Sequence, residues 1–330
     1  MWAYTIRRLI YMVVVIWVIS ILAFIIIELP PGDYLTSYIA QLQSQGGAIN
    51  EAQIAALKKQ YGLGLPAYLR YFKWMQNMFR GNFGRSFKWN EPVLDLLAER
   101  LPLTVLISLF TMIFTYTAAI PIGIYSALRQ YSIQDYVFTT VGFIGLAVPN
   151  FLLALLLMFF FFRYLGWSPG GLFSSQYQIA PWNFAKFADL LKHLPIPIIV
   201  IGTGATAGLI RVMRGCLLDE LRKQYVITAR AKGLKERTLL FKYPVRMALN
   251  PMISTIGWIL PAIVSGETIT AIVLNLPTTG VLLYGALMTQ DTYLAGGVIL
   301  FLTALTVIGT FISDILLVWI DPRIQYERSR

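Results

Sequence analysis

Residues 101–128 read LPLTVLISLFTMIFTYTAAIPIGIYSAL, a run of 28 residues without a charged side chain between Arg100 and Arg129. A helix rises about 1.5 Å per residue and the hydrocarbon layer of a bilayer is about 30 Å thick, so about 20 apolar residues can cross it. This stretch therefore predicts a membrane-spanning helix.

The same test, applied outward from this stretch, predicts six spanning helices in the chain. They cover about 9–29, 102–128, 136–164, 194–214, 247–274 and 293–319. Residues 164–185 are also uncharged, but their serine, proline, glycine and glutamine residues predict an aqueous loop.

Composition excludes several classes of protein. Of the 330 residues, 57% are hydrophobic and 13% are charged, whereas soluble proteins carry about 45–50% and about 25%. An ordinary soluble enzyme and a disordered chain are both excluded. His193 and Cys216 are the single histidine and cysteine of the sequence, so we expect no disulfide framework, no metal site and no cofactor bound by this chain.

The positive charges predict the orientation. Six spans place both termini on one side, and residues 211–246 carry ten lysines and arginines. Because short basic loops stay in the cytoplasm, we expect a multi-pass membrane protein with both termini cytoplasmic. Nucleic acid is not an expected partner, since no basic run is interleaved with stacking aromatics.

This topology divides the chain into four parts. Residues 1–29 hold the first span, 30–100 form an extracytoplasmic insert, 101–320 form a five-helix core, and 321–330 form a cytoplasmic tail. Within the insert, the pattern predicts helices over 49–60, 67–78 and 91–100.

Residues 215–246, here called the internal loop, are predicted to fold as two short helices. Leu217, Leu221 and Tyr225 recur every four residues and predict one apolar helical stripe. Gly233 suits the left-handed geometry that ends a helix. Leu234 to Phe241 reads as a second short helix that Pro244 ends. Such a loop could fill a groove on a cytoplasmic partner or rest on anionic lipid, and the residues alone leave both open.

Residues 225–237, YVITARAKGLKER, resemble the cytoplasmic signature of permease subunits of binding-protein-dependent ABC importers, in the peptide/nickel branch. Further stretches agree in order along essentially the whole chain: Pro31-Gly32-Asp33, residues 80–86, residues 92–102, Pro121-Ile122-Gly123, Pro149-Asn150-Phe151 and Asp321-Pro322-Arg323-Ile324. The chain departs from the broader family at Ile227-Thr228-Ala229, where Glu-Ala-Ala is usual. It departs from the branch at residues 277–280, where Pro-Gly-Leu-Gly is usual.

The resemblance implies an all-α, six-span permease of the type I ABC importer fold with an insert after its first helix. It also implies that the membrane is the inner membrane of a bacterium or archaeon. It implies four kinds of partner: a second, homologous permease, two cytoplasmic ABC ATPases, an extracytoplasmic solute-binding protein and the lipid bilayer. Oligopeptides are the main solutes of the branch, and oligosaccharides are the alternative. Residues 228–235 would form the coupling helix that contacts the ATPases: Thr228, Ala229, Arg230, Ala231, Lys232, Gly233, Leu234 and Lys235.

The chain itself is not expected to be an ATPase. A phosphate-binding loop needs lysine followed by serine or threonine, and no lysine in this sequence is. ATP and Mg are therefore expected on the partner ATPases.

Glu267 lies inside the fifth predicted span, where a carboxylate costs about 2.5–3.5 kcal/mol unless it is paired or hydrated. It belongs either to the translocation path or subunit interface, or to a structural hydrogen bond. An ion-driven secondary transporter would favour several such carboxylates or two repeated halves. Glu267 and Asp314 alone, without a repeat, argue against it.

Overall fold

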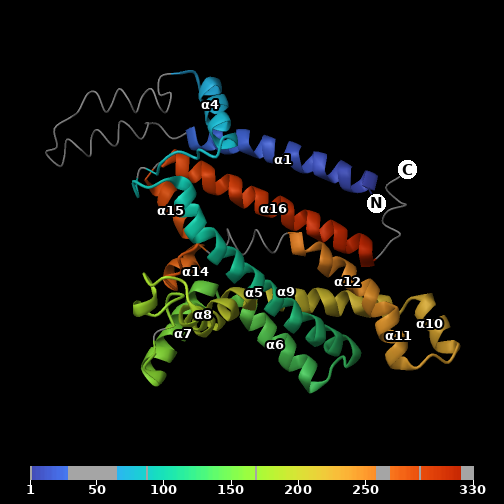
Figure 1. The fold of residues 1–330 in the computed structure, drawn as a ribbon. Helices are drawn as coiled ribbons and strands as arrows, with labels where there is room; N and C mark the ends of the chain where they lie inside the picture. Colours follow the sequence, from blue (N-terminus) through green and yellow to red (C-terminus); the bar gives the residue numbers. More distant parts are fainter. Residues whose placement is uncertain are drawn as a thin grey trace. The chain divides into compact units, whose positions relative to one another are not determined.

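The computed structural model describes residues 2–28, 65–86, 88–167, 169–257, 268–289 and 291–320. In these ranges every regular element is helical, and one isolated β-bridge pairs Arg85 with Pro92 (Figure 1). Four helical segments there are long and apolar enough to cross a membrane: Ile6–Ile25, Val93–Leu128, Phe184–Leu221 and Tyr293–Val318. A bent pair of helices makes five if it is counted as one span. The predicted all-α membrane class is confirmed.

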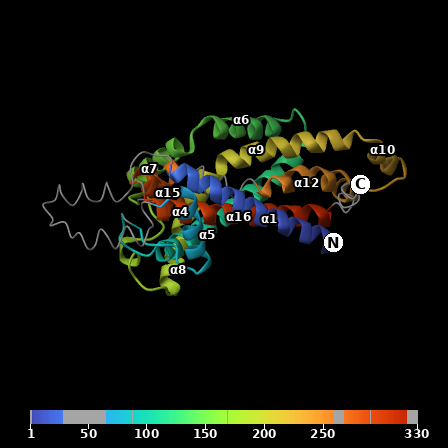
Figure 2. The same ribbon diagram turned by 90° about the horizontal axis from the view of Figure 1, so that it is seen from above.

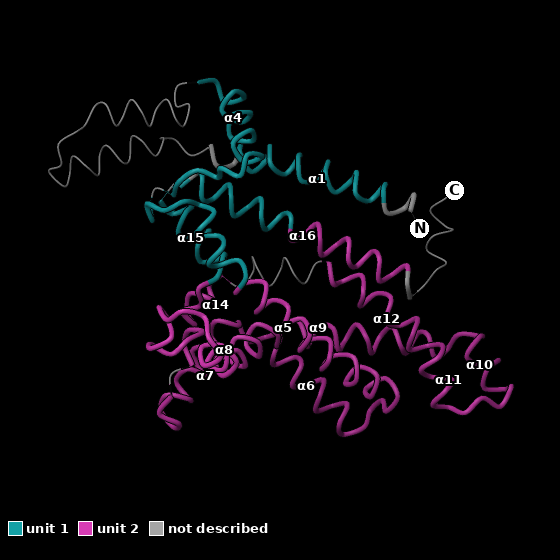
Figure 3. Tube along the Cα trace, in the orientation of Figure 1, with its two compact units in different colours: residues 1–102, 278–304 teal, residues 103–277, 305–330 magenta. Residues whose placement is uncertain are grey.

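The chain divides into two compact units, coloured separately in Figure 3. One comprises Met1–Pro102 with Thr278–Ala304, and the other comprises Leu103–Pro277 with Leu305–Arg330. Helices α5 (Val93–Leu128) and α16 (Thr292–Ile320) each contribute to both units.

The first unit contains α1 (Trp2–Glu28), α4 (Ala67–Phe79) and α15 (Thr279–Met288), together with the beginnings of α5 and α16. Its core joins α5, α15 and α16 through Val93, Leu96, Leu97, Leu282, Ala286, Leu294, Ala295 and Val298. Helix α4 packs on α1, where the Tyr71 and Ser20 hydroxyls lie 2.8 Å apart in a buried hydrogen bond. The predicted helix over 67–78 is thus confirmed.

The second unit is built around α9 (Pro195–Leu221), on which α6, α7, α8 and α12 pack. Its other helices are α6 (Ile133–Ala147), α7 (Asn150–Leu165), α8 (Phe184–His193), α10 (Gln224–Ala231), α11 (Glu236–Lys242), α12 (Pro244–Ser254) and α14 (Thr268–Val273), with a 3-10 turn at Ser175–Tyr177. Figure 2 shows α6 and α9 side by side. Arg214 of α9 donates to the Asp135 carboxylate of α6, with Nη2 3.0 Å from Oδ2.

Helix α9 connects two parts of the second unit that lie far apart. It begins where α8 ends and it leads into α10 and α11. In both views, α8 and α10 lie at opposite ends of α9 (Figures 1 and 2). Its 27 residues correspond to about 40 Å of helix at about 1.5 Å per residue.

The prediction of one helix over 136–164 is wrong. The chain bends by 102° between α6 and α7. Val148 is extended and Pro149 precedes the first residue of α7. The residue before a proline is forced out of the helical region, and proline has no N–H for the preceding turn.

The separate helix predicted over 91–100 is also wrong, because it is continuous with the span over 102–128 as α5. Pro102 removes one backbone donor, but Val93 and Leu97 before it and Leu103 and Ile107 after it are all buried. Packing on both sides of the proline therefore holds the helix together.

Two helices were missed, one prediction lies outside the described residues, and another is described only in part. Helix α8 lies mostly between the predicted loop over 164–185 and the span predicted from 194, and α15 lies between the fifth and sixth predicted spans. The predicted helix over 49–60 lies outside the described residues. The fifth predicted span, 247–274, corresponds to α12 at one end and α14 at the other, and residues 258–267 between them are not described.

Candidate functional site

The internal loop begins with a break between α9 and α10. Helix α9 ends at Leu221, and Lys223 is extended before α10 starts at Gln224. The single stripe predicted through Tyr225 is therefore wrong: Leu217 and Leu221 lie on α9, whereas Tyr225 lies on α10.

Glu220 bridges this break. Its carboxylate accepts from Lys223 Nζ at 2.6 Å and from the Tyr225 hydroxyl. Burial and the neighbouring Glu220 carboxylate raise the pKa of Tyr225, so the phenol keeps its proton and donates it to Glu220. This side-chain contact fixes the start of α10 to the end of α9.

The bend at Gly233 is confirmed. Gly233 has φ +75°, in the left-handed region that glycine adopts without a Cβ penalty. Its N–H donates to Arg230 O at 3.0 Å, and the Leu234 N–H donates to Ala229 O at 3.4 Å. These two bonds form a Schellman motif that satisfies the last carbonyls of α10.

Helices α10 and α11 enclose a small apolar core after the bend. It consists of Val226, Ala229, Leu239 and Leu240, with Leu221, Leu234 and Tyr243 partly buried against it. The second helix ends just before Pro244, as predicted: α11 stops at Lys242 and Tyr243 is its cap. Pro244 stands at the first turn of α12, where its missing N–H costs no hydrogen bond.

An ion pair crosses the bend. The Arg230 guanidinium makes two bonds to the Glu236 carboxylate, with Nη2 2.6 Å from Oε1 and Nε 3.2 Å from Oε2. Both side chains are about half exposed, at 52% and 54%. Hydrogen bonding to Arg230 lowers the pKa of Glu236, and the same bond raises the pKa of Arg230.

The predicted contact residues do not all face outward. Exposed residues are Thr228, Arg230, Ala231, Lys232, Gly233 and Lys235. Leu234 is half-buried and Ala229 is buried in the core of the loop, so its side chain is not available to a partner.

Sequence reasoning missed Glu236, which pairs with Arg230 across the bend, and the exposed Ile227 and Phe241. An arginine and a glutamate on either side of a glycine were the available signal for the pair. Glu267 lies outside the described residues.

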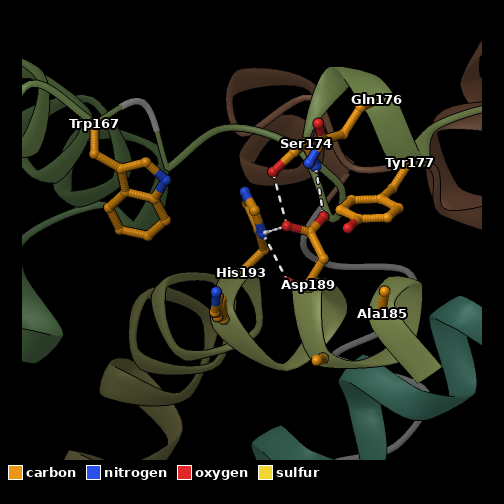
Figure 4. Close-up of a pocket in the computed structure, with 9 residues that line it drawn as sticks. Trp167, Ser174, Gln176, Tyr177, Ala185, Asp189 and His193 are labelled. Carbon is orange, nitrogen blue, oxygen red and sulfur yellow. Dashed lines mark hydrogen bonds and ion pairs between the residues drawn. The ribbon is translucent and has the colours of Figure 1, made fainter.

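A pocket of about 630 Å³ lies near the start of α9, at the other end of this helix from the internal loop. Figure 4 shows the residues that line it. We call it the α8 pocket. It is lined by Trp167, Ser174, Gln176, Tyr177, Ala185, Ala188, Asp189, Lys192 and His193. Sequence reasoning assigned no site here.

Two charged residues of α8 hold the wall of this pocket in place. The Asp189 carboxylate accepts from the Ser174 N–H and from the Ser174 hydroxyl, each at 2.7 Å. Lys186 donates to Ala180 O at 2.6 Å, and its ammonium lies 5.0 Å and 5.2 Å from the ring centres of Phe173 and Trp182. Both groups are buried, so the segment from 173 to 182 is fixed at each end.

Comparison with known proteins identifies the family. Residues 119–326 match the family described as "Binding-protein-dependent transport system inner membrane component", and residues 1–109 match its N-terminal counterpart. The chain belongs to this family. It is therefore a multi-pass inner-membrane component of a binding-protein-dependent importer, and permeases of this kind are not themselves enzymes.

Curated relatives cover the permease from end to end. The oligopeptide transport system permease protein AppB of Bacillus subtilis is 36% identical over 98% of this chain and 99% of its own length. A putative peptide permease protein of Brucella ovis is 33% identical over 98% of each chain. The peptidoglycan transport system permease protein YejB of Agrobacterium fabrum is 31% identical over 99% of each.

Proposed function

We propose that this chain is one of two permease subunits of an ATP-driven importer of oligopeptides. It would have the type I permease fold, with six spans and an extracytoplasmic insert after the first. The observation that carries the proposal is the internal loop: two helices locked by a glycine bend at the end of α9 form a rigid element that a cytoplasmic ATPase can hold.

The proposed orientation is supported by contacts between segments assigned to the same side. Asp135 and Arg214, which would both lie near the cytoplasmic face, form an ion pair. The Gly171 N–H donates to Leu274 O at 2.7 Å, and both residues would lie outside. These contacts agree with the proposed grouping of the segments by side, and the ten basic residues of 211–246 favour cytoplasmic termini.

In this mechanism, ATP and Mg bind to two partner ATPases that contact residues 228–235. Nucleotide can shift the permease only if it favours one of its states over the other. Movement of the ATPases would reach the membrane through α9, because Glu220 joins α10 to the last turn of α9. Glu267 is proposed to lie in the path or at the interface with the second permease.

Peptides are the proposed solutes. Two of the three relatives described above are named for oligopeptide or peptide transport, and the third is named for peptidoglycan transport. This favours peptides over oligosaccharides, with delivery by an extracytoplasmic solute-binding protein.

Replacing Gly233 tests the proposal. Gly233→Val should lower peptide-stimulated ATP hydrolysis by the reconstituted importer about tenfold, because a branched side chain in the left-handed region costs about 1–2 kcal/mol. Gly233→Asn is the matched control, since asparagine tolerates this conformation. Normal hydrolysis and uptake in the valine variant would contradict the coupling role of the loop.

A further inference from the structure

We propose that the α8 pocket binds the terminal carboxylate of a peptide on the outer side of the membrane, before the peptide enters the translocation path. The inference rests on the proposed function for its peptide ligand and for the side of the membrane. The α8 pocket lies at the other end of α9 from the internal loop, so this ligand site is separate from the proposed ATPase contact.

The size of the pocket suits a small ligand. Pockets for small molecules measure about 300–1,000 Å³, and this one measures about 630 Å³. Trp167 and Tyr177 give it aromatic walls on which the apolar part of a peptide end can pack.

The Asp189 carboxylate of the pocket is already hydrogen-bonded. Both oxygens of Asp189 accept hydrogen bonds from Ser174. His193 Nδ1 lies 2.8 Å from the carbonyl oxygen of Asp189, so this nitrogen must carry the proton and donate it. These bonds hold the pocket together and satisfy both carboxylate oxygens of Asp189.

The donors, in contrast, are available. Lys192 lines the pocket and is exposed. Within the described residues its charge acts on the Asp189 carboxylate, but its ammonium makes no hydrogen bond there. The indole nitrogen of Trp167 lies on the ring edge turned toward Ser174 and His193 (Figure 4). An ammonium and an indole N–H facing the same space form a site for an anionic oxygen, and a carboxylate is the anionic group that every unmodified peptide carries.

The pocket is also preformed, which favours binding. Because Asp189 and Lys186 fix the wall from Ser174 to Ala180, a ligand would not have to order this segment itself.

Cysteine labelling tests the site directly. In the complete importer in lipid nanodiscs, Ala188→Cys places a thiol in the pocket, and mass spectrometry follows its reaction with a membrane-impermeant maleimide. The native Cys216, near the other end of α9, reports in the same sample any change that is not specific to the pocket.

The probes are trialanine and trialanine with an amidated C-terminus. We expect the free acid to slow labelling at a concentration about tenfold lower than the amide, the difference of one charge-assisted hydrogen bond. Lys192→Gln should remove this difference, whereas Lys88→Gln, which exchanges a lysine that does not line the pocket, should keep it.

Three results would overturn the inference. The free acid and the amide could slow labelling of the pocket thiol equally, or the difference between them could persist in Lys192→Gln. Alternatively, only the ligand-free binding protein could slow labelling. The last would assign the pocket to protein docking. An importer that fails to take up peptides would contradict the proposed function, but it would leave the labelling result to decide on the pocket.

Discussion

The two ends of α9 are fixed by different chemistry. At the internal loop, the ion pair between Arg230 and Glu236 is half exposed, and a glycine bend with a small apolar core fixes the shape. At the α8 pocket, the Asp189 carboxylate is buried and its two bonds to Ser174 hold the neighbouring segment. Exposed ion pairs contribute little to the free energy of unfolding. Removal of a buried carboxylate, in contrast, leaves its hydrogen-bond donors unsatisfied, which costs more. Stability should therefore depend on polar contacts at the pocket and on apolar packing at the loop.

The largest effect should follow from Asp189→Ala. It removes two hydrogen bonds to a charged acceptor and leaves the Ser174 donors without a partner, which should lower the free energy of unfolding by about 3 kcal/mol. Thermal unfolding of the purified protein, followed by tryptophan fluorescence, measures this loss.

Ser174→Ala is the control for this prediction, because it keeps the backbone N–H bond and removes only the hydroxyl. It should cost less than Asp189→Ala. If both variants unfold as the wild type does, the polar contacts do not hold the pocket and the contrast between the two ends of α9 fails.

A smaller and more specific effect should follow from Glu220→Ala. Lys223 and Tyr225 then lose their shared acceptor, so α10 is no longer tied to the last turn of α9. We expect a loss of stability of about 1 kcal/mol, and fewer peptides imported for each ATP that the reconstituted importer hydrolyses.

Asp219→Ala is the matched control for Glu220→Ala. Asp219 is exposed on the same turn, so its replacement removes a carboxylate without touching the junction. If both variants import equally few peptides for each ATP hydrolysed, the negative charge at this turn matters and the contact of Glu220 with Lys223 and Tyr225 does not.

Local signals made parts of the fold predictable. The charge-free runs gave α1, α5 and α16, and Gly233 gave the bend, because helix length and positive φ depend on nearby residues. The 102° turn lies next to Pro149, but its size depends on how α6 and α7 each pack on α9 and was not predicted.

Contacts between distant residues could not be predicted. Ser86 donates to Asp291 at 2.6 Å across 205 positions. Ser174 reaches Asp189 only because α8 forms just before the span predicted from 194, where no helix was expected. Hydrogen bonds of this kind have no periodicity in the sequence. The α8 pocket was missed for this reason, whereas the internal loop was found.

The smallest effect concerns the pair across the bend. Arg230 lowers the pKa of Glu236 below its ordinary 4.5, so the folded protein binds this proton less tightly than the unfolded chain does. The contribution of the pair is therefore complete above pH 4.5 and is lost as the pH falls through the lowered pKa. Between pH 8 and pH 5 (ordinary working conditions) the unfolding temperature of Glu236→Gln should stay close to that of the wild type, because both side chains are half exposed and salt screens them.

ATP hydrolysis should distinguish Arg230 from Glu236, although the unfolding temperature does not. Glu236 bonds only to Arg230 in the loop, whereas Arg230 belongs to the proposed ATPase contact and has further N–H donors. Arg230→Gln should therefore lower peptide-stimulated ATP hydrolysis by several-fold and Glu236→Gln by less than twofold. Equal losses would restrict Arg230 to holding the bend, and the ATPase contact would then have to come from Lys232, Lys235 and the exposed apolar residues Ile227 and Phe241.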